Sequence, residues 1–365
     1  MTTYKGFFVD DDSDDTYVEL LRSKDEPGLD LELTKPENIT AFANQLSNAS
    51  PDIIALDYRL DENFIRCPEG QYKAGPLAQQ LRDLAADNWE KDFPIVLISA
   101  EDKIKRYYKP DATTHDLFDN VYVKEDVASN YLRYRSELAG LIEGYRLIKS
   151  YWPPSGKLCQ ILKLPEQERY AIEFDELLVA TEEIQVPHVL ARVLIHDLLT
   201  RPGILLSWDD VRAKLGVAHD SPDQEKLKDH LVGLRYEGAF AHTWERWWRH
   251  RFDQECGKLF GKSPTGIPGC ERVIALNEEF ELKLNAAKSR WSDSCDELFA
   301  FSCAVCGYPT ELRHSIAAYD SRTPKFADRK RICWDCVRTD RHEGKLRIAS
   351  SDVSLAERIK SNTIG

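Results

Sequence analysis

The first 150 residues alternate short apolar runs with amphipathic segments, and this rhythm limits the fold more than any other feature of the chain. The runs IIAL and PIVLI contain almost no polar residue, which is typical of strands in a parallel sheet covered on both faces. Strands that alternate with helices predict an α/β domain with a doubly wound, five-stranded parallel sheet. The predicted strands cover residues 4–9, 29–34, 52–58, 94–99 and 120–124.

Segments with helical periodicity lie between these strands, at residues 16–22, 39–46, 75–85 and 127–148. The rhythm stops at the Pro-Pro-Ser-Gly sequence of residues 153–156, which indicates a linker. We therefore predict three domains: an α/β domain over 1–150, a mainly helical domain over 151–290, and a small metal-binding module with a C-terminal tail over 291–365.

Within the middle region, helices are predicted at residues 186–199, 207–215 and 223–236. Ser207 is a suitable N-cap for the second of these, and Gly216 follows its end. These helices would permit a winged-helix-like unit over 186–240, with plain helical packing as the alternative. Residues 241–254, which hold three tryptophans and three arginines, are predicted as one helical stretch whose tryptophans fill a core or a partner interface.

Charge is distributed unevenly along the chain. Residues 1–150 hold 29 acidic against 18 basic side chains, so this part should repel nucleic acid. Residues 313–347 hold 10 basic against 5 acidic side chains, which makes them the better place for a polyanion contact. No apolar run approaches the roughly 18 residues needed to span a bilayer. We expect a cytoplasmic protein without a membrane partner, in which cysteines bind metal more readily than they form disulfides.

Polar side chains follow the predicted strands where each strand ends. Asp10 and Asp11 follow the first strand, Asp57 the third, Ser99 the fourth and Lys124 the fifth. The carboxyl ends of such strands share one edge of the sheet, so these groups should converge. Three carboxylates that close need a cation, and hard oxygen ligands favour Mg²⁺. The ammonium and the hydroxyl beside them suit a phosphoryl group.

At these positions the sequence resembles the receiver domain of two-component response regulators, over about residues 4–149. The resemblance implies a receiver-like, flavodoxin-like fold in which Asp10 and Asp11 hold Mg²⁺ together with Asp57 and the backbone carbonyl of Arg59. It further implies that Asp57 accepts phosphate from a sensor histidine kinase or another phosphodonor. Ser99 and Lys124 would then contact the phosphoryl oxygens.

Three features depart from the family pattern. The segment from Asp57 to Gly75 is longer than family members usually have there, and Glu125 follows the lysine where the family usually has proline. Val121 occupies the position of the aromatic switch residue, and Tyr122 should face the other side of the sheet. A receiver fold that serves only for docking, without phosphorylation, therefore stays open as an alternative.

Two Cys-x-x-Cys pairs predict a structural Cys₄ zinc site, formed by Cys303, Cys306, Cys333 and Cys336. The spacing also faintly resembles the treble-clef modules of HNH endonucleases, in which a histidine such as His314 would act as general base. However, no asparagine is obvious before Cys333, and Val337 stands where a histidine often follows. A structural, basic zinc module is therefore favoured over a nuclease.

These observations predict a cytosolic response regulator, in which phosphorylation of Asp57 controls a helical and zinc-binding output region. We expect the helical region to contact a protein partner and expect no enzymatic turnover. Two alternatives stay open: a phosphorylation-gated DNA-binding protein, with Arg329, Lys330 and Arg331 against phosphates, and an HNH-like endonuclease. Self-association into a homodimer is open as well.

Overall fold

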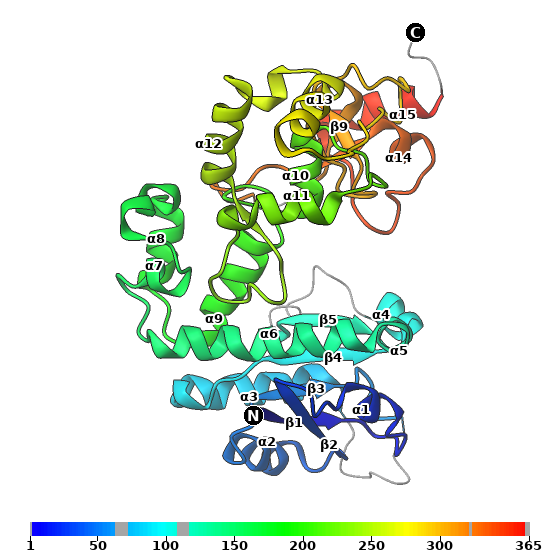
Figure 1. Cartoon of the computed structure of the whole chain (residues 1–365). Coiled ribbons are helices and arrows are strands. Elements are labelled where there is room, and N and C mark those ends of the chain that lie inside the picture. The colour runs from blue at the N-terminus through cyan, green and yellow to red at the C-terminus, as the bar shows by residue number, and fades with distance from the viewer. Residues whose placement is uncertain (1, 63–71, 108–116, 321–322, 362–365) are drawn as a thin grey trace. The chain divides into compact units, whose positions relative to one another are not determined.

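The computed structural model describes residues 2–62, 72–107, 117–320 and 323–361 (Figure 1). The chain packs into two compact units. The first comprises Met1–Arg169, Leu178–Ile195 and Glu237–Trp244, and the second comprises Tyr170–Leu177, His196–Tyr236 and Glu245–Gly365. The domain boundaries at residues 150 and 290 stay predictions. No helix within the described ranges combines the length and the apolar character that a membrane crossing requires.

The first unit contains a sheet of five parallel strands in the order β2-β1-β3-β4-β5. This order reverses between β1 and β3, as in flavodoxin-like doubly wound sheets, and the predicted fold class is confirmed. β3 and β4 are buried along their whole length, as their apolar sequences predict. The strands are β1 (Thr3–Val9), β2 (Gly28–Thr34), β3 (Ile53–Leu56), β4 (Ile95–Ser99) and β5 (Asn120–Val123).

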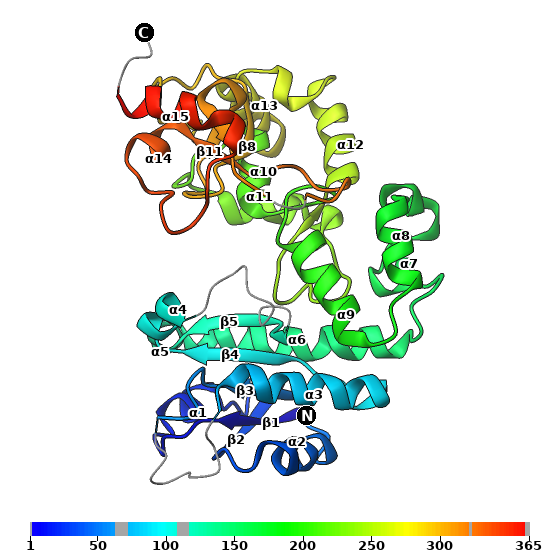
Figure 2. The same ribbon diagram turned by 180° about the vertical axis from the view of Figure 1, so that it is seen from behind.

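Helices cover both faces of this sheet (Figures 1 and 2). α2 packs against α3 over a core that contains Phe42, Ile54 and Leu97, while α1 packs against α6. The helices are α1 (Thr16–Leu21), α2 (Ile39–Asn48), α3 (Ala74–Asp87), α4 (Glu101–Tyr107), α5 (Lys124–Ser129) and α6 (Tyr131–Ser150). The single helix predicted over 127–148 is in fact two, α5 and α6, which are separated at Asn130.

The remainder of the first unit follows α6 along the chain, and two of its parts pack on that helix. It includes α7 (Leu158–Ile161), α9 (Pro187–Arg192) and residues 237–244. The approach to α6 is close: a Cβ atom on Gly144 would lie 2.1 Å from Cδ1 of Phe240. A glycine is therefore required where this segment crosses the helix.

The second unit is built mainly from helices around the buried residues Val211, Trp247 and Leu276. α10 begins as predicted, because Ser207 and Asp210 form a reciprocal capping box, and it ends at Gly216, whose φ is 72°. The unit also contains α8 (Asp175–Glu182, shared with the first unit), β6 (Leu205–Leu206), α10 (Trp208–Leu215), α11 (Gln224–His230), β7 (Trp247–Trp248), α12 (Arg249–Phe260) and α13 (Gly269–Phe280).

The helical stretch predicted over 241–254 is wrong in its first half. Trp247 and Trp248 form β7, which pairs antiparallel with β6, and α12 begins only at Arg249. Both tryptophans are buried, which agrees with their predicted role in a core.

Short strands and two helices make up the C-terminal part of the second unit. β8 (Phe299–Ser302) pairs with β9 (Pro309–Glu311), and β10 (Ser315–Ala317) pairs with β11 (Arg331–Cys333). They are followed by α14 (Trp334–Arg338) and α15 (Val353–Lys360). α10 packs on β8 and β9, so residues of the predicted middle and C-terminal domains belong to one compact unit.

Candidate functional sites at the sheet edge and the cysteine cluster

Four of the five polar groups predicted to converge at the carboxyl edge of the sheet do so around Lys124: Asp10, Asp57, Ser99 and the lysine itself. Its Nζ lies 2.8 Å from Oδ2 of Asp10 and 2.9 Å from Oδ1 of Asp57. Lys124 is the first residue of α5, directly after β5, while Asp10 and Asp57 directly follow β1 and β3. The point where the strand order reverses, between β1 and β3, therefore carries both carboxylates.

Asp57 is almost fully enclosed, with 1% of its surface exposed. The Ser99 hydroxyl donates to its Oδ1 at 3.1 Å, and the backbone N–H of Arg59 donates to its Oδ2 at 2.9 Å. Lys103 of α4, which the sequence did not indicate, places its Nζ 3.9 Å from Oδ2 of Asp57 and 2.6 Å from Oε2 of Glu62. Its position four residues after Ser99, on the helix that follows β4, could have suggested it.

Asp11 and Arg59 take different places at this edge. Asp11 is buried beside Asp10, and the Arg59 side chain pairs with Asp61, with Nε 2.5 Å from Oδ1. Among the described residues, Asp10, Asp11 and Asp57 do not form a trio whose ligand oxygens all lie within 4.8 Å of one another. In this arrangement the Lys124 ammonium bridges the two carboxylates of Asp10 and Asp57.

The electrostatics of the edge show a shortage of positive charge. Burial raises the pKa of the Asp10 carboxyl, and the nearby Asp57 charge raises it further against the opposing effect of Lys124. The pKa of Lys124 is raised: burial lowers it, but the charges of Asp57 and Asp10 outweigh that effect. Carboxylate and carbonyl oxygens with excess negative charge fit the ligand preference of Mg²⁺. The residues present are thus compatible with the predicted magnesium site, which stays a prediction.

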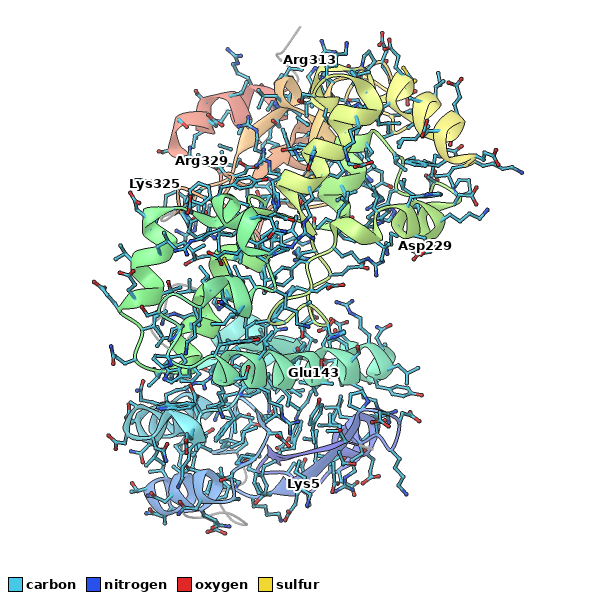
Figure 3. The ribbon with its side chains drawn as sticks, turned by 60° about the vertical axis from the view of Figure 1, so that its left-hand side comes forward. Lys5, Glu143, Asp229, Arg313, Lys325 and Arg329 are labelled. Carbon is cyan, nitrogen blue, oxygen red and sulfur yellow. The ribbon has the colours of Figure 1, made fainter. Side chains whose placement is uncertain are left out.

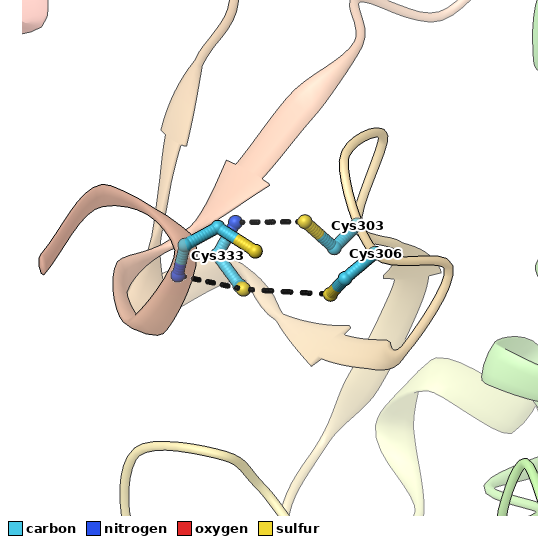
Figure 4. A group of neighbouring side chains, drawn as sticks. Cys303, Cys306 and Cys333 are labelled. Carbon is cyan, nitrogen blue, oxygen red and sulfur yellow. Dashed lines mark hydrogen bonds between the residues drawn. The ribbon is translucent and has the colours of Figure 1, made fainter. Parts of the chain in front are cut away.

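The four cysteines of the two Cys-x-x-Cys pairs come together in the second unit, and their Sγ atoms all lie within 4.8 Å of one another (Figure 4). The Sγ atoms of Cys306 and Cys333 are 3.9 Å apart, which excludes a disulfide between them. Tetrahedral geometry with Zn–S bonds of about 2.3 Å requires sulfur atoms about 3.8 Å apart. The cluster is therefore able to bind a metal ion such as zinc.

Backbone N–H groups point at the sulfur atoms, as thiolate ligands require. The N–H groups of Cys333 and Val305 donate to Sγ of Cys303 at 3.3 and 3.5 Å, and that of Cys336 donates to Sγ of Cys333 at 3.5 Å (Figure 4). Such donors stabilise the charged form of a thiol. Cys333 also serves as the N-cap of α14, so the helix start and the second pair are one structure.

His314 lies in a second cluster, with Glu297 and Glu311, whose ligand atoms are also within 4.8 Å of one another. Its Nδ1 bonds to Oε1 of Glu311, to which the Ser289 hydroxyl donates at 2.5 Å. Arg313 pairs with Glu297. Sequence reasoning missed both glutamates, because they precede the histidine by spacings that match no motif.

The strand order, with helices on both faces of the sheet, defines the first unit as a flavodoxin-like doubly wound domain. Among solved structures, the chain is similar to the signal receiver domain of the putative response regulator NarL from Mycobacterium tuberculosis, at 16% identity and a TM-score of 0.25. The match covers 37% of this chain and 98% of that chain. No family model and no curated protein matches the sequence. At this TM-score the likeness adds no argument, and the fold assignment rests on the strand order.

Proposed function

We propose that the first unit is a phosphoacceptor receiver and that the chain acts as a response regulator. The observation that carries the proposal is the shared Lys124 ammonium, which joins Asp10 to Asp57 while Ser99 donates to the same Asp57 oxygen. A buried carboxylate with a hydroxyl and an ammonium on one oxygen has the groups that phosphoryl transfer uses.

In the proposed reaction, a carboxylate oxygen of Asp57 attacks the phosphorus of a phosphohistidine on a sensor kinase. The new O–P bond forms as the P–N bond breaks, and the departing nitrogen keeps the electron pair. Lys124 and Ser99 lie within reach of the phosphoryl oxygens and donate to them. Mg²⁺, held by Asp10, Asp11, Asp57 and the Arg59 carbonyl, would neutralise charge on the transferred group.

The output is proposed to come from the second unit, through contact with a protein partner. Phosphorylation adds a charge of about −1.5 to −2 at the sheet edge. This charge would draw Lys124 away from Asp10 and so change the start of α5, which begins at that lysine.

Phosphorylation is tested by incubating the full chain with Mg²⁺ and acetyl phosphate and measuring the intact mass. We expect one phosphoryl adduct, sensitive to hydroxylamine, in the wild type and in the control Asp12→Asn, whose side chain is exposed and bonds only to the Ser13 N–H among the described contacts. Asp57→Asn should give none. A wild-type chain that stays unmodified contradicts the proposal and leaves the docking alternative.

Magnesium binding is tested separately by thermal unfolding with increasing Mg²⁺. A ligand that binds only the folded state stabilises it and so raises the unfolding temperature. At a ligand concentration 100 times its Kd, the free energy of unfolding rises by about 2.7 kcal/mol. The wild type should respond, while Asp11→Asn should respond weakly, because it removes one predicted ligand. An equal response in both would remove Asp11 from the site.

A further inference from the structure

The second unit contains a partly open cavity of about 780 Å³ that belongs to neither site described above. It is lined by α10, by residues 199–202 and 246–253, by β8, and by the segment that enters β11. Its volume lies within the range of about 300–1,000 Å³ that is typical of small-molecule sites. Arg329, which lines the cavity, and Lys325 lie close together on the segment before β11 (Figure 3).

The lining is strongly cationic. Seven of its side chains are lysine or arginine, and three are aspartate. Two of these cations are neutralised: Arg201 pairs with Asp320, and Arg249 pairs with Asp328 at 2.7 Å. Of the three lining aspartates, Asp328 and Asp253 both pair with Arg249, the latter at 3.7 Å. The other, Asp210, accepts hydrogen bonds from Ser207 and Ser302.

The remaining cations have no carboxylate partner in the described part of the chain. The Arg246 guanidinium donates to the carbonyl oxygens of Leu199 and Glu245, and Arg331 donates to Ser315. Neither Lys214 nor Lys330 makes an ion pair with a described residue. Lys214 is the strongest indication of a bound anion among them, because only 8% of its surface is exposed.

Leaving charges buried without a partner is costly to the folded protein. Burial lowers the pKa of the Lys214 ammonium, and the neighbouring Arg249 charge lowers it further. Burial also lowers the pKa of Arg246, and burial together with Arg201 lowers that of Lys330. Positive charges that repel one another around one cavity would be stabilised by an anion of more than one charge.

We infer that this cavity binds a small molecule that carries a diphosphate or triphosphate group. The lysines and arginines would contact the phosphate oxygens, with hydroxyl groups of Thr200 and Ser263 available as further donors. The apolar wall formed by Leu206, Phe301 and Leu346 would accept the organic part of a nucleotide. Because Lys214 is enclosed, a small ligand fits better than the continuous backbone of a nucleic acid, which requires exposed cations. The inference does not depend on phosphorylation of Asp57.

Isothermal titration calorimetry on the full, zinc-loaded chain tests the inference, with ADP, ATP and pyrophosphate as probes. We expect binding of at least one probe. Stronger binding of the nucleotides identifies a nucleotide site, and equal binding of pyrophosphate identifies a site for inorganic polyphosphate. Lys214→Met should weaken the binding about 10- to 100-fold, as loss of one charged hydrogen bond does. The matched control is Lys258→Met on α12, whose side chain is exposed and paired with Glu255 outside the cavity.

Stability separates a ligand contact from a structural role. Lys214→Met removes a buried, unpaired charge, so its unfolding temperature without ligand should equal or exceed that of the wild type. If this variant does not fold, Lys330→Gln replaces it, with the same expected loss of binding. Failure of all three probes to bind the wild type, or binding unchanged by both substitutions, overturns the inference. Tighter binding of a single-stranded oligonucleotide than of any nucleotide overturns it as well.

Discussion

Both ends of the parallel sheet carry buried carboxylates, but the two ends differ in the hydrogen-bond donors and charges that surround them. Before β4 and β5, at the amino end, Asp92 and Asp119 share the guanidinium of Arg82, at 2.9 and 2.8 Å. At the carboxyl end, Asp10 and Asp57 share the ammonium of Lys124 at nearly the same distances. At each end one cation is thus shared by two carboxylates, and at the carboxyl end Lys103 also lies 3.9 Å from Asp57.

The ends differ in the remaining donors. At the amino end, Tyr145 donates to Asp119 at 2.7 Å, as does the N–H of Ile95 at 2.8 Å, while His188 bonds to Asp92 through its N–H and its ring. Burial raises the pKa of Asp92, but the hydrogen bonds from His188 and the Arg82 charge outweigh it, so the pKa is lowered. At the carboxyl end the pKa of Asp10 is raised, because burial exceeds the help from Lys124.

The two clusters contain similar residue types. The number of hydrogen-bond donors and cations around the carboxylates is what distinguishes the structural cluster at the amino end from the reactive one at the carboxyl end. The amino-end cluster satisfies its carboxylates completely and gains nothing from another cation. The carboxyl-end cluster is short of positive charge and can gain from a metal ion. Four substitutions can test this difference.

The largest effect is expected for Arg82→Met, which removes the guanidinium that Asp92 and Asp119 share. Asp92 and Asp119 would remain buried without it, so the free energy of unfolding should fall by about 3–5 kcal/mol. Urea unfolding of the full chain measures the change. The matched control is Arg146→Met, which breaks a half-exposed pair with Asp52 in the same unit and should cost about 1 kcal/mol or less. Similar losses in both variants would show that the amino-end cluster is not a structural one.

A smaller effect of opposite sign is expected for Asp10→Asn at the carboxyl end. In the absence of divalent ions the variant should be more stable by about 1 kcal/mol at neutral pH, because one carboxylate then remains for Lys124. A carboxyl whose folded pKa is raised destabilises the fold above that pKa, and this penalty disappears as the pH falls through it. The gain should therefore vanish in acid. With saturating Mg²⁺ the order should reverse, since the variant lacks a metal ligand.

The pH dependence of Asp92 has the opposite sign. Its folded pKa is lowered, so its contribution to stability is present above the unfolded value of about 3.9 and is lost as the pH falls through the folded pKa. Comparison of wild-type and Asp10→Asn stabilities between neutral and acidic pH checks the sign for Asp10. The same comparison with Arg82→Met, which removes one cause of the lowered pKa of Asp92, checks the sign for Asp92. If the gain in stability from Asp10→Asn grows on acidification, the raised pKa of the Asp10 carboxyl is contradicted.

The carboxyl-end cluster was predictable from the sequence, whereas the amino-end cluster was not. Asp10, Asp57, Ser99 and Lys124 each follow a strand with a clear apolar pattern, and parallel strands bring such positions to one edge. Arg82 instead lies within α3, where an arginine ordinarily faces solvent, and its partners follow 10 and 37 residues later. No local sequence pattern predicts that Arg82 pairs with these two aspartates.

The same distinction holds in the second unit. The Cys₄ cluster was predictable, because four thiols at fixed spacing have few other uses. The cationic cavity was not, because Lys214 in the sequence WDDVRAKL has the appearance of a surface lysine on α10. The strand β7 was missed because two residues are too few to show an alternating pattern.

The smallest effect is expected from two buried tyrosines, only one of which has a hydrogen-bond partner for its hydroxyl group in the described structure. Tyr145 donates to Asp119 at the amino end, and Tyr145→Phe should lower the free energy of unfolding by about 1 kcal/mol. The Tyr122 hydroxyl on β5 is buried without a hydrogen-bond partner in the described structure, although its ring packs edge-on against Tyr134. Tyr122→Phe should therefore be neutral or stabilising, because it removes a buried polar atom that makes no bond. Urea unfolding of both variants measures the two changes in the free energy of unfolding. Equal decreases would mean that the effect depends on burial of the hydroxyl group and not on its hydrogen bond to the amino-end cluster.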